Sequence, residues 1–189
     1  MTNLEKVRSL VKSKCKETDW KYHVLPVVKY AKMLVRKLNA DEELAELGAL
    51  LHDIGWIEDE KNDPVHEKVG APIAEKILRD FGYSENVIEE VKHCIESHRS
   101  SKDVQPRTII AKIVANADGM SHFDVPYFLQ MGLRKKNNNL EETVRWTLDV
   151  VERNWNKKLT LPEAREIMKE KYEAARLMLN STLELANEE

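Results

Sequence analysis

The fold is decided by residues 47–55, which read Leu-Gly-Ala-Leu-Leu-His-Asp-Ile-Gly. Ala45, Gly48 and His52 recur at helical spacing, so small residues let a neighbouring helix approach the imidazole closely. Asp53 ends this apolar helix, where a carboxylate opposes the helix dipole and is costly to bury alone. We therefore expect a cation, a metal or several hydrogen-bond donors beside Asp53; the simpler alternative is a helix cap that faces water.

Outward from this stretch, the whole chain reads as helices, because only six Gly and six Pro punctuate it and no segment alternates with period two. Thr2 and Glu5 form a capping-box pattern that opens the first helix. Asp41 is the expected N-cap of the helix that bears His52, and Gly55 is expected to let the chain turn away. The sequence predicts an all-α fold with helices over residues 2–15, 20–38, 41–55, 66–81, 84–99, 107–120, 140–156 and 162–185, and a short helix between 121 and 139.

The chain of 189 residues has the length of one domain, or of one domain with an appendage. Its 30 basic and 33 acidic groups give a net charge of −3, which argues against nucleic-acid binding by bulk charge. No apolar run is long enough to span a bilayer, and the first residues lack the apolar core of a secretory signal. Cys15 and Cys94 form no CxxC pair, so neither a disulfide framework nor a cysteine-based zinc site is expected. These features predict a cytoplasmic protein with no membrane partner.

Four groups expected to point inward arise on three predicted helices: His23, the adjacent His52 and Asp53, and Asp118. His23 shares the apolar stripe of its helix, and Asp118 lies four residues after Val114 at the end of an apolar stretch. Two imidazoles and two carboxylates suit a divalent transition ion such as Mn, Fe, Co, Ni or Zn. For His23 a core histidine bonded to a carbonyl is the open alternative.

The other four histidines are of two kinds. His98 continues an apolar helix face and His66 opens a helix soon after Asp53, so both can reach the same cavity. For His66 the alternative is a helix-start residue that faces solvent. His93 is expected at the surface or rim, and His122 in solvent or in a cap contact.

A known family carries the same motif order of His23, His52, Asp53 and Asp118. The chain in this respect resembles the HD-domain superfamily of metal-dependent phosphohydrolases. Residues 47–55 are similar to the end of that family's central helix, and residues 95–98, Ile-Glu-Ser-His, to its I-x-x-H segment. The resemblance covers roughly residues 18–125.

The resemblance implies an orthogonal helical bundle. We expect the HD domain to span residues 1–135, and the C-terminal helices over residues 136–189 to pack on the same domain. It implies a first metal held by His23, His52, Asp53 and Asp118. Some members hold a second metal, for which this chain offers His66 and His98 with Asp53 bridging. Single-metal relatives use such histidines for phosphate or water instead. One or two divalent ions are therefore expected, with Mg²⁺ admitted beside the transition metals.

These implications predict a hydrolase that applies metal-activated water to a small phosphorylated substrate, a phosphomonoester or a phosphodiester, with nucleotides among the candidates. Asp53 is expected to orient the water, and His66 or His98 to bind phosphate or move a proton. Two alternatives stay open: a di-iron HD-type oxygenase, and a non-catalytic metal-binding regulatory module.

Trp56 marks a departure from the family pattern. The cyclic-dinucleotide phosphodiesterase branch places a Lys at this position, and the alarmone hydrolase and deoxynucleotidase branches place a Glu there, so no specific substrate is carried over. Lys61, Arg99 and Lys102 are cations expected near the rim and are candidate substrate contacts, although each is more simply a solvated surface residue. The C-terminal helices are expected to pack on the bundle or to make a homodimer contact.

Overall fold

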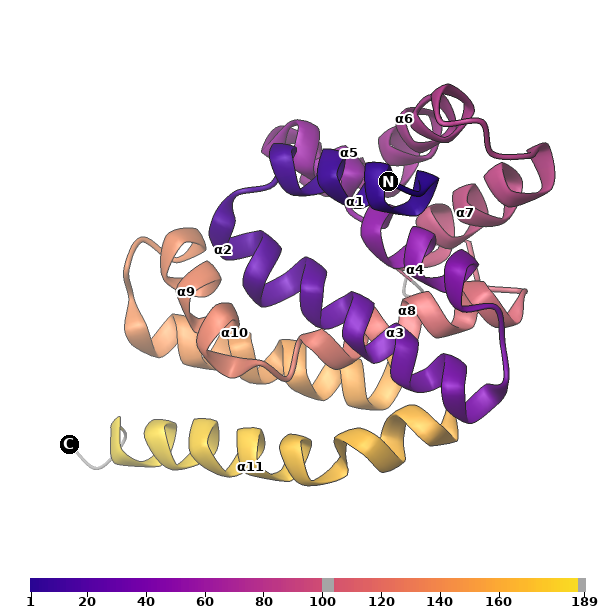
Figure 1. The fold of residues 1–189 in the computed structure, drawn as a ribbon. Coiled ribbons are helices and arrows are strands. Elements are labelled where there is room, and N and C mark those ends of the chain that lie inside the picture. Colours follow the sequence, from indigo (N-terminus) through magenta and orange to yellow (C-terminus); the bar gives the residue numbers. More distant parts are fainter. Residues whose placement is uncertain (100–103, 187–189) are drawn as a thin grey trace. The chain divides into compact units, whose positions relative to one another are not determined.

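The computed structural model describes residues 1–99 and 104–186, and every regular element in these two ranges is a helix (Figure 1). The all-α prediction is therefore confirmed. In chain order the elements are α1 (Asn3–Lys14), α2 (Glu17–Asp19), the π-helix η1 (Trp20–Val24), α3 (Leu25–Leu38), α4 (Glu42–Leu51), α5 (Ile54–Glu58), the 3₁₀-helix η2 (Glu60–Val65), α6 (His66–Asp80), α7 (Glu85–Ser97), α8 (Ile109–Ser121), α9 (Val125–Lys135), α10 (Leu140–Arg153), the π-helix η3 (Asn154–Lys158) and α11 (Pro162–Ala186).

The chain forms two compact units, Met1–Asp118 and Gly119–Glu189, and the division falls inside α8. All the predicted ligand residues belong to the first unit. The expected packing of residues 136–189 on the HD domain stays a prediction. No helix in the described ranges has the length and apolar character that a membrane crossing requires.

Helix α4 forms the interior of the first unit, because all its residues from 45 to 51 are buried. It packs against α1, α3 and α7. A Cβ atom on Gly48 would lie 2.9 Å from Val114 Cγ2 and 3.3 Å from the Cys94 side chain. Gly48 was expected to let one neighbouring helix approach, and it allows close contact with both α7 and α8.

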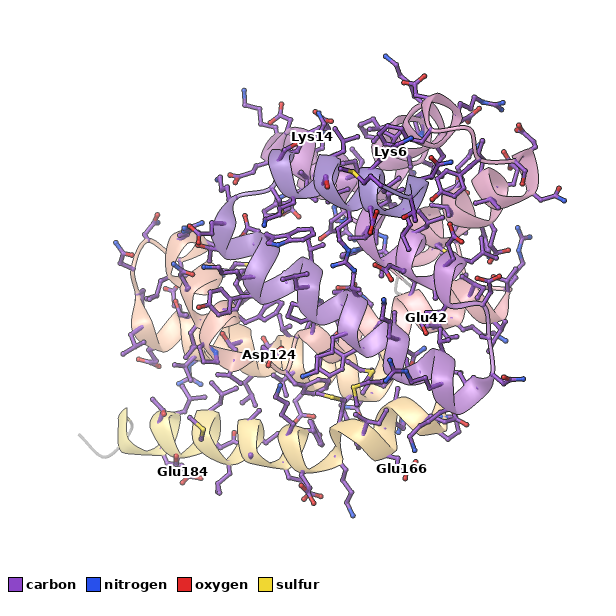
Figure 2. The ribbon with its side chains drawn as sticks, viewed as in Figure 1. Lys6, Lys14, Glu42, Asp124, Glu166 and Glu184 are labelled. Atoms are coloured by element: carbon purple, nitrogen blue, oxygen red, sulfur yellow. The ribbon has the colours of Figure 1, made fainter. Side chains whose placement is uncertain are left out.

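The helix starts in the first unit follow the predicted side-chain caps. The Glu5 N–H donates to Thr2 Oγ1 over 3.1 Å, and the Thr2 N–H donates to Glu5 Oε2 over 2.7 Å, which completes the capping box. Asp41 Oδ1 accepts from the Leu44 N–H over 2.9 Å. Other charged side chains, including Lys6 and Glu42, lie on the outside of these helices (Figure 2).

The predicted helix over residues 20–38 begins with a wider turn than expected. Residues Trp20–Val24 form a π-helix, and the Leu25 N–H donates to the Trp20 carbonyl. Pro26 has no N–H to offer to the preceding turn, and its ring crowds the carbonyl four residues earlier. The wider turn relieves this crowding, so that Pro26 sits in the first turn of α3.

The predicted helix over residues 41–55 ends earlier than expected, at Leu51. Asp53 leaves the helical conformation with φ −105° and ψ 17°, and α5 restarts at Ile54. A Cβ atom on Gly55 would lie 2.4 Å from the carbonyl oxygen of His66 and 2.9 Å from the backbone nitrogen of Gly70. The role expected for Gly55 was therefore wrong: it allows α5 to approach α6 closely, and the turn falls two residues earlier.

In the second unit, α10 packs against α9 and α11. The buried cluster there consists of Tyr127, Phe128 and Val150, with Met131 and Trp146 partly buried against it. Leu177 and Met178 on α11 are 72% and 62% exposed, so part of this long helix carries an uncovered apolar surface. The predicted homodimer contact of these helices stays a prediction.

Candidate metal centre

Three side chains of the first unit form what we call the first ligand group: His23, His52 and Asp118. They come from η1, from the residue that follows α4, and from α8. His23 Nε2 lies 3.1 Å from His52 Nε2 and 3.7 Å from Asp118 Oδ1, and His52 Nε2 lies 3.9 Å from the same oxygen. The ligand atoms of this buried group thus lie close enough to share one ion.

Asp53, His66 and His98 form the second ligand group. His66 is the first residue of α6, and His98 directly follows α7. His66 Nε2 lies 3.0 Å from His98 Nε2 and 3.1 Å from Asp53 Oδ1, and His98 Nε2 lies 3.4 Å from that oxygen. His66 is 8% exposed, which rules out the alternative of a helix-start residue that faces solvent.

The Asp53 carboxylate links the two ligand groups. Its Oδ2 faces the first group, 3.0 Å from His23 Nε2 and 3.2 Å from His52 Nε2. Its Oδ1 faces the imidazoles of His66 and His98. One carboxylate therefore lies between two pairs of imidazoles with one oxygen toward each pair, which is how a carboxylate bridges two ions.

Three of the imidazoles are oriented by their own backbone. The Nδ1 atoms of His52, His66 and His98 lie 2.8, 2.9 and 2.6 Å from the carbonyl oxygens of Ala49, Asp63 and Ile95, three residues earlier in each case. A carbonyl only accepts, so each Nδ1 carries the hydrogen. In the neutral ring, Nε2 then presents a lone pair toward the centre, as it does in metal-binding histidines.

These residues fit a bound divalent ion. The Nε2 atoms of His66 and His98 face each other at 3.0 Å, and in the neutral rings both are acceptors, so they cannot hydrogen-bond to each other. A cation that accepts both lone pairs removes this conflict. Two ligands about 2.1 Å from one ion lie about 3.0 Å apart when their bonds make a right angle. The donor set of imidazoles and carboxylates matches Mn, Fe, Co, Ni or Zn.

The electrostatics of the centre keep the carboxylate charged. Burial opposes the ionisation of Asp53, but the surrounding imidazoles outweigh burial and hold the pKa of Asp53 well below its usual value. Burial likewise opposes the charged form of His52 and lowers its pKa, but the carboxylates of Asp53 and Asp118 outweigh burial and raise this pKa to about 9. For His98, burial dominates and its pKa is lowered. A bound dication takes the place of the protons that otherwise compensate the carboxylates.

The remaining predicted residues lie elsewhere or are engaged. His93 Nε2 accepts from the Arg107 N–H over 3.0 Å, and His122 Nδ1 lies 2.7 Å from the Asn154 amide nitrogen. Neither belongs to a ligand group. Lys102 lies outside the described residues. Arg99, predicted as a solvated cation or a substrate contact, instead contacts the surroundings of His66, a feature for which the sequence alone gave no signal.

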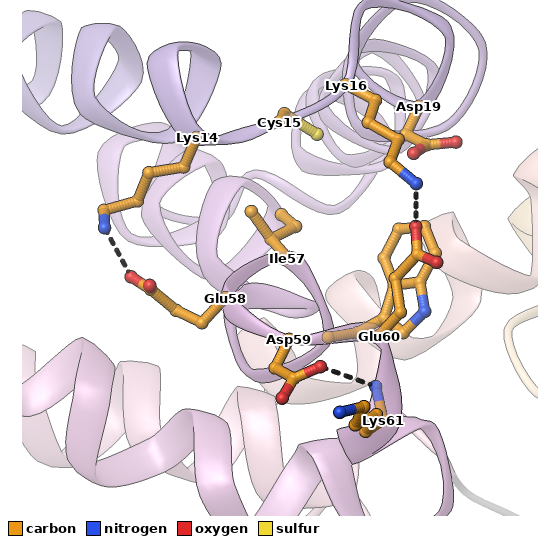
Figure 3. Close-up of a pocket in the computed structure, with 10 residues that line it drawn as sticks. Lys14, Cys15, Lys16, Asp19, Ile57, Glu58, Asp59, Glu60 and Lys61 are labelled. Carbon is orange, nitrogen blue, oxygen red and sulfur yellow. Dashed lines mark hydrogen bonds and ion pairs between the residues drawn. The ribbon is translucent and has the colours of Figure 1, made fainter.

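A pocket of about 430 Å³, which we call the lateral pocket, is lined by residues that follow Asp53 in the chain and by residues near the end of α1 (Figure 3). Its walls are residues 14–16 with Asp19 and residues 56–61. Two ion pairs join the walls: Lys14 Nζ lies 2.6 Å from Glu58 Oε1, and Lys16 pairs with Glu60. The figure shows both pairs.

A backbone hydrogen bond links a wall of the lateral pocket to Asp53. The Trp56 N–H donates to the Asp53 carbonyl over 2.9 Å. Burial, followed by the charges of Asp19 and Asp53, raises the pKa of the Cys15 thiol in the pocket wall to about 12, so the thiol stays protonated. The residues that line the pocket belong to neither ligand group, and Trp56 links them to Asp53 through the backbone.

A comparison with known protein families assigns both the fold and the candidate metal centre to one family. The model of the family described as HD domain matches residues 20–121, the range that contains both ligand groups. The chain therefore belongs to the HD domain family, which the motif order had already indicated as a superfamily of metal-dependent phosphohydrolases. The family prediction is confirmed, and the role of each residue as a ligand stays a prediction.

Known proteins similar to this chain include two named Ribonuclease Y. That of Acidothermus cellulolyticus is 34% identical over 99 residues, which cover 52% of this chain and 18% of the relative. That of Enterococcus faecalis is 36% identical over 99 residues, which cover 52% and 17%. The matched segment thus spans less than a fifth of the length of these relatives.

A solved structure shares the fold over nearly the whole chain. It is the crystal structure of a predicted HD superfamily hydrolase from an uncultured Thermotogales bacterium, with a TM-score of 0.66. The two chains are 20% identical, and the superposition covers 98% of this chain and 94% of the other. This likeness supports the helical HD-domain fold.

Proposed function

We propose that this protein is a metal-dependent hydrolase of a small phosphorylated molecule, with phosphomonoesters, phosphodiesters and nucleotides as candidate substrates. One observation carries the proposal: the Asp53 carboxylate lies between two pairs of imidazoles whose Nε2 atoms converge on it. In a family of metal-dependent phosphohydrolases, such a centre is suited to hold one or two divalent ions beside a phosphoryl group.

The residues have separate tasks in this proposal. The first ligand group with Asp53 would hold one ion, and Asp53 with His66 and His98 would hold a second. A divalent ion supplies a water of lowered pKa and polarises a phosphoryl oxygen. The Asp53 carboxylate orients the attacking water by accepting a hydrogen bond from it. Where a single ion is bound, His66 or His98 in its imidazolium form would donate from Nε2 to a phosphate oxygen or pass that proton to the leaving oxygen, and water would then return a proton to the ring.

The lateral pocket supports a small substrate over a nucleic-acid strand. Its volume of about 430 Å³ is in the range of pockets that enclose one small molecule. The ion pairs Lys14–Glu58 and Lys16–Glu60 join its two walls, so each of these two lysines already has a carboxylate partner. The net charge of −3 also gives no bulk attraction for RNA. The relatives named Ribonuclease Y are much longer proteins, and the segment that matches this chain covers less than a fifth of their length.

Trp56 provides a test of the lateral pocket. Trp56→Leu should raise KM for a small phosphorylated substrate and leave the metal content unchanged, because Trp56 lines the pocket and belongs to neither ligand group. Steady-state kinetics and elemental analysis of the same preparation check this. An unchanged KM in Trp56→Leu would show that the lateral pocket does not bind the substrate.

The decisive experiment for the proposed function joins elemental analysis of the purified protein to a screen of phosphomonoesters and phosphodiesters. Asp53→Asn should lower kcat by a factor of about a thousand, because it removes the charge shared by both ion sites. Asp80→Asn is the matched control, since Asp80 is an exposed carboxylate at the end of α6. Wild-type turnover in Asp53→Asn would contradict the proposal.

The same experiment separates the alternatives. The bridging position of Asp53 also suits a di-iron centre, so about two iron ions per chain with oxygen consumption would identify an HD-type oxygenase. Bound metal without turnover across the whole screen would identify a regulatory metal-binding module. Expected partners are a small phosphorylated substrate and a second copy of the chain, and a cytoplasmic location remains part of the proposal.

A further inference from the structure

Arg99 is held by two hydrogen bonds that one guanidinium nitrogen donates. Its Nη1 donates to the Asp63 carbonyl over 2.8 Å and to Glu67 Oε2 over 3.2 Å, and it lies 3.5 Å from His66 Nδ1. The Arg99 side chain is 26% exposed, whereas that of Glu67 is 5% exposed. An ion pair with one buried partner is held more firmly than a surface pair, because water competes less for the charges.

The Asp63 carbonyl is the point where Arg99 and His66 meet. This oxygen accepts from His66 Nδ1 over 2.9 Å and from Arg99 Nη1 over 2.8 Å, so both its lone pairs are engaged. Asp63 lies in η2, the short 3₁₀-helix that leads into α6. The hydrogen bond to this carbonyl is what turns His66 Nε2 toward the centre. Arg99 thereby fixes the carbonyl that orients the imidazole.

Arg99 also joins the two helices that supply the second ligand group. It follows His98 directly at the end of α7, and its partner Glu67 follows His66 directly at the start of α6. The Arg99–Glu67 pair therefore sets the spacing between the two histidines from outside the centre. No such contact reaches the first ligand group among the interactions of Arg99 in the described residues.

We propose that Arg99 is a positioning residue for the second ligand group: it holds His66 through the Asp63 carbonyl and Glu67, and so sets the affinity of the ion bound by Asp53, His66 and His98. This inference rests on the proposed function only in assuming that two ions bind. Removal of partners that orient a metal-binding histidine costs about 10–100-fold in metal affinity. The effect is confined to one of the two ions.

The test is calorimetric titration of the metal-free protein with Mn²⁺, with elemental analysis after dialysis. In Arg99→Met the first binding step should be unchanged and the second weakened about 10–100-fold. Arg99→Lys should recover part of the loss, since its ammonium can also donate hydrogen bonds, but the shorter side chain brings it less close to the Asp63 carbonyl and Glu67. Arg79→Met is the matched control, because the half-exposed Arg79 pairs with Glu75 and Glu85, which belong to neither ligand group.

The outcomes separate this inference from the proposed function. Two wild-type binding steps with an unchanged second step in Arg99→Met would overturn the positioning role while the hydrolase proposal stands. Equal weakening of both steps, with a lower Tm, would identify Arg99 as merely structural and overturn it as well. A single binding step in the wild type overturns the inference, and hydrolysis by that one-ion protein would keep the proposed function. The selective loss in Arg99→Met supports the inference whether or not a substrate has been found.

Discussion

The two ligand groups are built by different means. The first draws on η1, the end of the buried helix α4 and α8, and its side chains are 7% exposed or less. The second draws on helix ends beside the short η2 segment, and its Asp53 is 14% exposed. Packing of the core thus places the first group, whereas polar contacts around Asp63 orient His66 in the second. We expect the first ion to be held more tightly and the second to be lost first on dialysis.

The largest expected effect is on kcat and metal content, when one histidine of each ligand group is replaced in turn. His52→Ala should lower kcat by a factor of about a thousand and abolish tight metal binding, since it removes a fully buried side chain that we predict to be a ligand. His66→Ala should keep one ion and lose about 10–100-fold in kcat. Elemental analysis and kinetics on both variants check this. Equal metal contents in the two variants would mean that the groups are not distinct.

A second effect concerns the close approach of α5 and α6. Gly55→Ala places a Cβ atom against the His66 carbonyl, so we expect a loss of about 2–3 kcal/mol in the free energy of unfolding and a weaker second ion. Gly82→Asn is the control, because Gly82 has φ 77° with open space around it, and Asn tolerates that conformation. Urea titration measures both. If the urea midpoint of Gly55→Ala equals that of the wild type, the backbone around residue 55 adjusts without cost and the prediction is contradicted.

A third effect tests how the first group is anchored. Glu46 on α4 is 3% exposed and pairs with Arg8 of α1 and Lys32 of α3. Glu46→Gln should destabilise the protein by about 1–3 kcal/mol but leave the metal stoichiometry unchanged, since the packed core still places His52. Glu42→Gln, which removes an exposed partner of the same lysine, should cost less than about 0.5 kcal/mol. Loss of the first ion in Glu46→Gln would contradict anchoring by packing.

The smallest effect is a pH dependence of the metal-free protein. Burial lowers the pKa of His52, but Asp53 and Asp118 outweigh it and raise this pKa from 6.5 to about 9. The charged imidazole therefore stabilises the metal-free fold fully below pH 6.5, and this contribution is lost as pH rises through 9. Tm should fall between about pH 7 and pH 10 in metal-free wild type and less in His52→Gln. An equal fall of Tm in wild type and His52→Gln would contradict a stabilising interaction of charged His52 with Asp53 and Asp118.

Local sequence patterns predicted the helices and their starts, because caps and apolar spacing act within a few residues. The capping box of Thr2 and Glu5 and the N-cap Asp41 are examples. The π-turn before Pro26 and the break at Asp53 were not predicted, because each depends on how one turn packs against its neighbours. Gly55 was misread for the same reason: its near neighbour, the His66 carbonyl, is distant in sequence.

For the centre, the sequence could name the side chains but not their arrangement. The inward faces of His52 and Asp118 follow from helical spacing, whereas the split of the Asp53 oxygens between two imidazole pairs depends on tertiary distances. Arg99 is the clearest case, since its contact with Asp63 crosses from one helix end to another. Only the folded chain brings that carbonyl and that guanidinium together.

The most direct measurement of the central claim is anomalous X-ray diffraction from crystals of the protein loaded with Mn²⁺. Two peaks should flank the Asp53 carboxylate, one contacted by the first ligand group and the other by His66 and His98. A single peak away from Asp53, or no peak among these six side chains, would contradict a metal centre organised around this carboxylate.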